Sequence, residues 1–155
     1  MIQFAPSPGI IRATRIDFEL LASIINSIVA RHHDEAHTSK AVTVWIYKTP
    51  TSSSHLGIAA YEISTIYINT TEIRTHRKII STLLHELRHI IQHAYFGLEP
   101  YGIPENNNQY KKLPIELDAS RFEKLTTSIL KLYDDHKKAD LVYKKYNLST
   151  FTEPT

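Results

Sequence analysis

Three residues in the middle of the chain have the types and the spacing of a metal site. His85, Glu86 and His89 form the pattern H-E-x-x-H. In an α-helix of about 3.6 residues per turn, residues four apart lie on the same face, so both imidazoles can bind one metal ion. Glu86 directly follows the first histidine, where its carboxylate can reach a water on that metal and take its proton. The pattern predicts a zinc ion with a general base beside it.

The third ligand must come from elsewhere, because a catalytic zinc site has three protein ligands and leaves its fourth position to water. His93 lies one turn beyond His89, but a third successive turn rotates away from the first by about 80°, so we do not expect it to share the ion. Glu116 is the preferred ligand, because it lies early in a helix that can fold back across the motif. Asp118 is the alternative, and whichever carboxylate is not a ligand can accept a hydrogen bond from an imidazole or pair with an arginine.

The segments that must position these residues can be predicted from periodicity. From Thr75 to Leu98 apolar residues recur every three or four positions, which predicts one long amphipathic helix with Thr75 as its N-cap. Residues 99–113 contain two prolines, a glycine and three consecutive asparagines, and predict a loop. A final helix begins at Pro114 and carries Glu116 in its first turn.

The remaining sequence predicts a small sheet behind the motif helix. An amphipathic helix spans residues 17–31, with Asp17 available as its N-cap. Three short segments, 41–48, 56–62 and 65–69, are rich in β-branched and aromatic residues and predict strands. We expect an α+β fold with a sheet of three or four strands, and we expect Trp45, on the first of them, in the core.

Composition limits the class of protein. The chain has 155 residues, no cysteine, 18 Lys and Arg and 16 Asp and Glu, hence a net charge of +2. This suits a single domain spanning 1–155, with residues 141–155 expected to be a frayed tail. Without cysteine, disulfide scaffolds, iron–sulfur clusters and thiolate zinc sites are excluded. We expect no membrane span and a cytoplasmic protein, and the scattered charges argue against a dedicated nucleic-acid surface.

Two stretches resemble a known family. TLLHELRH, with His85 and His89, and PIELDASRF, with Glu116, look like the metal-binding motifs of the gluzincin metallopeptidases. With the strand TIYIN ahead of them, the chain is similar to compact bacterial and phage members of the ImmA/IrrE-like and SprT-like type, over about residues 56–125.

The resemblance implies a small zincin-like domain in which His85, His89 and Glu116 hold Zn²⁺ and Glu86 is the general base. Gluzincins often have Asp or Asn four residues after the ligand glutamate, whereas this chain has Ser120, so the acceptor beside the ligand imidazoles stays open. SprT-like proteins use three histidines, and no third histidine is suitably placed here.

Three classes of function remain. The first is a cytoplasmic zinc metallopeptidase, a hydrolase of protein or peptide substrates. The second is a zinc-binding regulatory module without catalytic activity. The third is a zinc hydrolase of another bond, or a protease that associates with DNA. For the peptidase, the candidates to stabilise the oxyanion are His93, Tyr95, Tyr101 and Tyr110, and the sequence does not choose among them.

Overall fold

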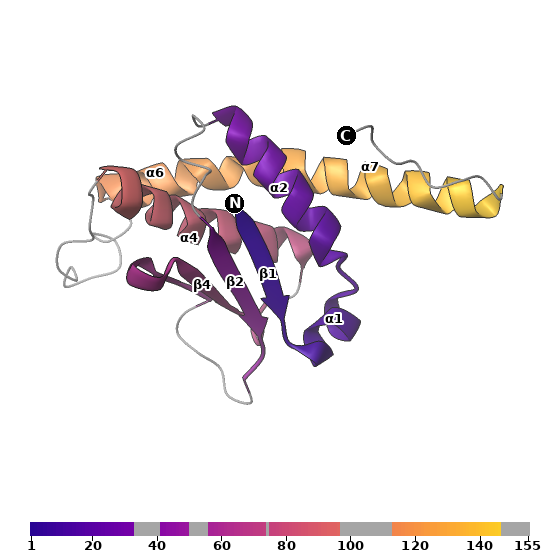
Figure 1. The fold of residues 1–155 in the computed structure, drawn as a ribbon, viewed down its shortest axis with the longest axis horizontal. Coiled ribbons are helices and arrows are strands. Elements are labelled where there is room, and N and C mark those ends of the chain that lie inside the picture. Colours follow the sequence, from indigo (N-terminus) through magenta and orange to yellow (C-terminus); the bar gives the residue numbers. More distant parts are fainter. Residues whose placement is uncertain (33–40, 50–55, 74, 97–112, 147–155) are drawn as a thin grey trace.

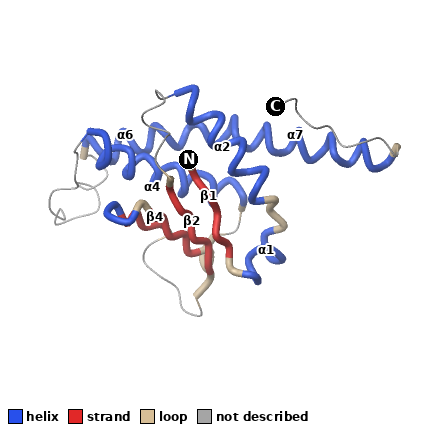
Figure 2. Tube along the Cα trace, in the orientation of Figure 1, coloured by secondary structure: helices blue, strands red, loops and turns tan. Residues whose placement is uncertain are grey.

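The computed structural model describes residues 1–32, 41–49, 56–73, 75–96 and 113–146. They form an α+β arrangement with one sheet and helices packed on it (Figure 1, Figure 2). In chain order the elements are β1 (Ile2–Pro6), α1 (Pro8–Thr14), α2 (Phe18–His32), β2 (Val42–Tyr47), β3 (Gly57–Ala60), η1 (Tyr61–Ile63), β4 (Thr65–Asn69), α4 (His76–Phe96), α6 (Pro114–Phe122), η2 (Glu123–Leu125) and α7 (Thr126–Lys145). No helix among these residues is both long enough and apolar enough to span a bilayer.

The sheet has four strands in the order β1-β2-β4-β3. β1, β2 and β4 run parallel, and the edge strand β3 runs antiparallel to β4. The three predicted strands are confirmed, and the fourth, β1, is the one that the sequence did not identify. Its five residues carry no alternating pattern, and its partner β2 lies some forty positions away, so pairing rather than local propensity forms it.

One face of the sheet is packed against helices. Alternate residues of β2, Val42, Val44 and Ile46, are buried, as are Ile66 and Ile68 of β4. Helix α2 packs on β1, α4 packs on β3 and β4, and α7 contacts both of these helices. The described sheet and helices therefore share one core.

The opposite face of the sheet corrects one prediction. Trp45 is 49% exposed, so its expected place in the core is wrong. The alternation of residues along β2 correctly assigns Val42, Val44 and Ile46 to one face of the sheet and Trp45 to the other. It does not indicate that the described helices cover only the first of these faces. On the uncovered face Trp45 lies level with Tyr67 and Ile58 of the neighbouring strands, and Ile58 is likewise exposed.

The predicted N-caps are confirmed. The backbone N–H of Leu20 donates to Asp17 Oδ1 at 3.1 Å, which satisfies an amide in the first turn of α2. The backbone N–H of Lys78 donates to Thr75 Oγ1 at 3.1 Å in the same way. The start of α4 is thereby fixed, and with it the height at which the H-E-x-x-H motif lies along the helix.

The C-terminal helix departs from the prediction in two ways. It begins at Pro114 as expected, but a single turn of 3₁₀ helix, η2, separates α6 from α7. It also continues to Lys145, so the part of the predicted frayed tail from 141 to 145 is helical. The buried residues of α7 all lie in its first half, and its second half extends past the other helices (Figure 1). Residues 147–155 of that tail, and residues 99–112 of the predicted loop, lie outside the described residues.

Candidate metal centre

The structure brings together three side chains that the sequence selected. His85 and His89 lie one turn apart on α4, and Glu116 reaches them from the first turn of α6. The two Nε2 atoms are 3.2 Å apart, and the Glu116 carboxylate oxygens lie 2.9 Å from His85 Nε2 and 3.0 Å from His89 Nε2. One ligand atom from each residue lies within 4.8 Å of the other two. This group could hold a metal ion.

The outer nitrogen of His85 is held by a residue that the sequence analysis did not select. Glu123 Oε1 lies 2.6 Å from His85 Nδ1. Because a carboxylate accepts hydrogen bonds, Nδ1 donates to Glu123, and Nε2, which faces Glu116 at 2.9 Å, is the nitrogen whose proton a metal ion would displace. Glu123 therefore selects the tautomer that a metal ligand needs.

Gln92 holds the outer nitrogen of His89. Its side chain is 2% exposed, and its Oε1 lies 2.8 Å from His89 Nδ1. Two hydrogen bonds on the side of the Gln92 amide away from His89 fix its orientation. Gln92 Nε2 donates to Ile115 O at 3.0 Å and to Asp118 Oδ2 at 2.8 Å. Its oxygen must then face His89, whose Nδ1–H donates to it. Both imidazoles thus present Nε2 to the same point.

Asp118, the alternative third ligand, has another partner. Arg88 Nε donates to its Oδ2 at 2.6 Å, and the Arg88 guanidinium lies over the ring of Phe122, 5.6 Å from its centroid. Partial burial alone would raise the pKa of Asp118, but the hydrogen bonds from Arg88 and Gln92 outweigh it and hold that pKa below its ordinary value. Of the two carboxylates, Glu116 therefore lies with the imidazoles, and Asp118 ties α6 to α4.

The charges around the imidazoles favour a cation. Burial alone would lower the pKa of His85, but its hydrogen bonds to Glu116 and Glu123 outweigh burial and raise the pKa to about 10. The pKa of His89 is raised as well, because hydrogen bonds to Glu116 and Gln92 outweigh its burial. Positive charge is thus favoured between the carboxylates, and a divalent metal supplies it while displacing the protons.

Glu86 lies beside this group without being part of it. Burial raises the pKa of its carboxyl above the ordinary value, although the two histidines and a hydrogen bond from the Ala59 backbone act to lower it. Its carboxylate lies against the edge strand β3, where Glu86 Oε1 would be 3.4 Å from a Cβ at Gly57, and it interacts electrostatically with both imidazoles. A carboxylate in this position is suited to receive a proton from a reactant bound at the metal.

Gly57 of β3 is what allows the strand to come so close to Glu86. A Cβ at this position would lie 2.8 Å from Thr82 Cγ2 and 2.9 Å from Glu86 Cγ, closer than real Cβ contacts allow. Glycine is therefore required here by close approach of the backbone to the side chains of α4.

We expect Gly57→Ala to lower the free energy of unfolding by about 1–3 kcal/mol, because β3 or the Glu86 side chain must move to admit the methyl group. Urea denaturation of the metal-free protein measures this. Gly9→Ala is the matched control, since a Cβ at Gly9 meets nothing within 4 Å. Equal stability of the Gly57→Ala variant and its parent would show that the strand does not approach α4 this closely.

We expect Glu123→Ala to weaken metal binding by roughly 10- to 100-fold, the usual effect of losing an acceptor behind a ligand imidazole. Competition with a chromogenic chelator measures the affinity. Glu123→Gln keeps an acceptor for the His85 Nδ1–H and should recover most of the loss, whereas Asp135→Ala, at an exposed residue of α7 that pairs with Lys131, should change nothing. If Glu123→Ala bound metal like Asp135→Ala, Glu123 would have no role in orienting His85.

Both residues that the sequence analysis missed left a weak signal. Gln92 follows His89 by three positions, so it shares a helix face with it, and Glu123 follows Glu116 by seven, two helical turns along.

Among the oxyanion candidates, His93 stacks against Tyr61 with ring centroids 4.9 Å apart. The side chain of Tyr95 and the residues Tyr101 and Tyr110 lie outside the described part of the chain.

Comparison with known proteins does not assign the site. The chain matches no protein family, no curated protein and no solved structure. Its function is therefore argued from the arrangement of its own side chains.

Proposed function

We propose that the protein is a zinc metallopeptidase with a zincin-like fold, in which His85, His89 and Glu116 hold the metal and Glu86 is the general base. The observation that carries the proposal is the convergence of two Nε2 atoms and one carboxylate, with both outer imidazole nitrogens held by acceptors. An accidental cluster on a helix surface would not need Glu123 and Gln92 behind it.

The spacing of the donor atoms fits zinc. Two nitrogens bound tetrahedrally at about 2.0–2.1 Å from zinc lie about 3.3 Å from each other. The distance between His85 Nε2 and His89 Nε2 is 3.2 Å. Imidazole nitrogen with one carboxylate oxygen is also a donor set that zinc accepts readily.

A catalytic role is favoured over a structural one by the number of ligands. Within the described residues the group contains three donors, whereas structural zinc sites are closed by four protein ligands. When bound, zinc supplies a Lewis acid that polarises a carbonyl and acidifies water. Glu86 takes the proton of the attacking water and returns it to the leaving amine, so its place beside the triad matters more than its basicity in isolation.

A peptide is the favoured substrate because of the strand next to Glu86. β3 is an edge strand of the described sheet, and an extended peptide can pair with such an edge through its backbone. Ala59, whose N–H donates to Glu86, and the close Gly57 lie on this strand. A paired peptide would then pass directly beside the general base.

The proposal is tested by hydrolysis of an unfolded protein substrate by the zinc-loaded chain and by its Glu86→Gln variant. Stoichiometric zinc binding by a parent protein that hydrolyses no peptide would instead assign the site to a regulatory module.

A further inference from the structure

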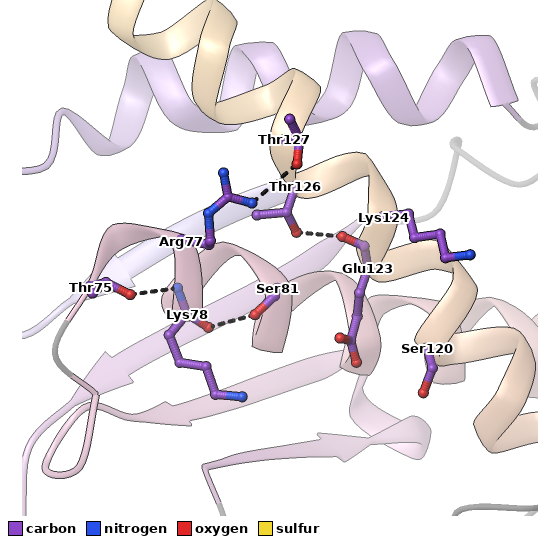
Figure 3. Close-up of a pocket in the computed structure, with 9 residues that line it drawn as sticks. All are labelled: Thr75, Arg77, Lys78, Ser81, Ser120, Glu123, Lys124, Thr126 and Thr127. Atoms are coloured by element: carbon purple, nitrogen blue, oxygen red, sulfur yellow. Dashed lines mark hydrogen bonds between the residues drawn. The ribbon is translucent and has the colours of Figure 1, made fainter.

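A hollow of ≈ 390 Å³ lies between the start of α4 and the junction of α6 with α7. Figure 3 shows its two walls: Thr75 to Ser81 on one side, Ser120 to Thr127 on the other. It adjoins the metal centre, because Glu123 lines the hollow and its Oε1 lies 2.6 Å from His85 Nδ1, but neither histidine nor Glu116 lines it. The metal chemistry proposed above makes no use of it.

Three basic residues line this hollow. Arg77 and Lys78 come from α4 and Lys124 from η2, so each wall carries basic side chains; in Figure 3 the Arg77 guanidinium is directed toward Thr127, and Lys124 extends away from α4. In the part of the chain that the structure describes, none of the three forms a salt bridge with a carboxylate. The lining contains one acid, Glu123, and its Oε1 lies 2.6 Å from His85 Nδ1. The formal charge of this lining, three basic residues and one acid, is therefore +2.

Hydroxyl groups lie between these charges. Thr75, Ser81, Ser120 and Thr127 line the hollow. Arg77 Nη1 donates to Thr127 Oγ1 at 3.1 Å, which holds the guanidinium at the rim while four of its five N–H donors remain for other acceptors. The hollow thus combines fixed positive charge with short polar groups, the usual composition of an oxyanion site.

We propose that this hollow binds the phosphate group of a small phosphorylated ligand. A phosphate carries a charge of about −1.5 to −2 and three acceptor oxygens, which matches several cations better than a single carboxylate does. A small ligand is favoured over nucleic acid because the three basic residues line a single concavity. The chain as a whole carries 18 basic and 16 acidic residues, an excess of only two, whereas an extended nucleic-acid backbone needs many cations.

Titration of the metal-free protein with inorganic pyrophosphate, followed by amide chemical shifts, tests the proposal without involving the metal centre. We expect saturable shifts confined to residues 75–81 and 120–127. Lys78→Gln and Lys124→Gln should each weaken binding by roughly fivefold or more, because each removes a charge-assisted contact. Lys131→Gln is the matched control, since Lys131 lies on α7 outside the hollow and pairs with Asp135.

Several results would overturn the proposal. The absence of saturable binding is one, and equal weakening by Lys131→Gln and Lys78→Gln is another, since it would indicate diffuse surface charge. A single-stranded oligonucleotide provides the second arm of the experiment. Binding to the oligonucleotide without binding to pyrophosphate would make this surface a nucleic-acid interface instead.

Discussion

Glu86→Gln will lower the rate of peptide hydrolysis by roughly 100- to 10,000-fold, the usual contribution of a general base. The amide has almost the same shape as the carboxylate and keeps an oxygen that can accept the Ala59 N–H. It cannot take a proton from water at neutral pH. The side chains of His85, His89 and Glu116 are unchanged, so zinc should remain bound at one ion per chain.

This prediction is checked by measuring kcat and zinc content on the same preparation. Glu72→Gln, the same change at an exposed residue, serves as the control and should match the parent in both. Full activity in Glu86→Gln would remove the general base from the mechanism. Loss of zinc would instead mean that Glu86 is a ligand, and the assignment of Glu116 would then have to be revised.

Glu116→Gln will weaken zinc binding by about a hundredfold or more. Structural zinc sites with four ligands bind with apparent free energies of about 10–16 kcal/mol, so an average ligand contributes about 3 kcal/mol, which is roughly a factor of 100. Replacing the carboxylate by a neutral amide removes the only charged donor of the group. In the metal-free variant the two imidazoles lose the carboxylate that raises their pKa values and can become neutral, so no buried charge is left unpaired and the chain should remain folded.

Asp118→Asn is the matched control for this substitution. Asp118 contacts Arg88 and Gln92 rather than the imidazoles, so we expect the zinc affinity to fall by less than about tenfold. Chelator competition on both variants gives the comparison. A larger loss of zinc in Asp118→Asn than in Glu116→Gln would exchange the roles of the two carboxylates.

Local patterns in the sequence predicted most of the frame that carries the site. The motif helix, its Thr75 cap and the start of α6 at Pro114 depend on short-range rules of periodicity and capping, and the structure has all three. The nearness of Glu116 to the two histidines was also predictable, because a helix that returns across α4 brings its first turn beside the motif. The metal it holds and its reaction are still proposals.

What the sequence could not predict depends on contacts between distant segments. Glu123 reaches His85 only because α6 crosses α4 at one particular height, and no local pattern encodes that height. The position of Trp45 depends on which face of the sheet the helices cover, and β1 forms only by pairing with β2. These are tertiary effects that override or supplement propensity.

The most direct measurement is an anomalous difference map, recorded at the zinc absorption edge, from a crystal of the zinc-loaded protein. We predict one strong peak per chain, at about 2.0–2.2 Å from His85 Nε2, His89 Nε2 and a Glu116 carboxylate oxygen. A map with no peak there, or with the peak on other side chains, would contradict the metal centre on which the proposed function depends.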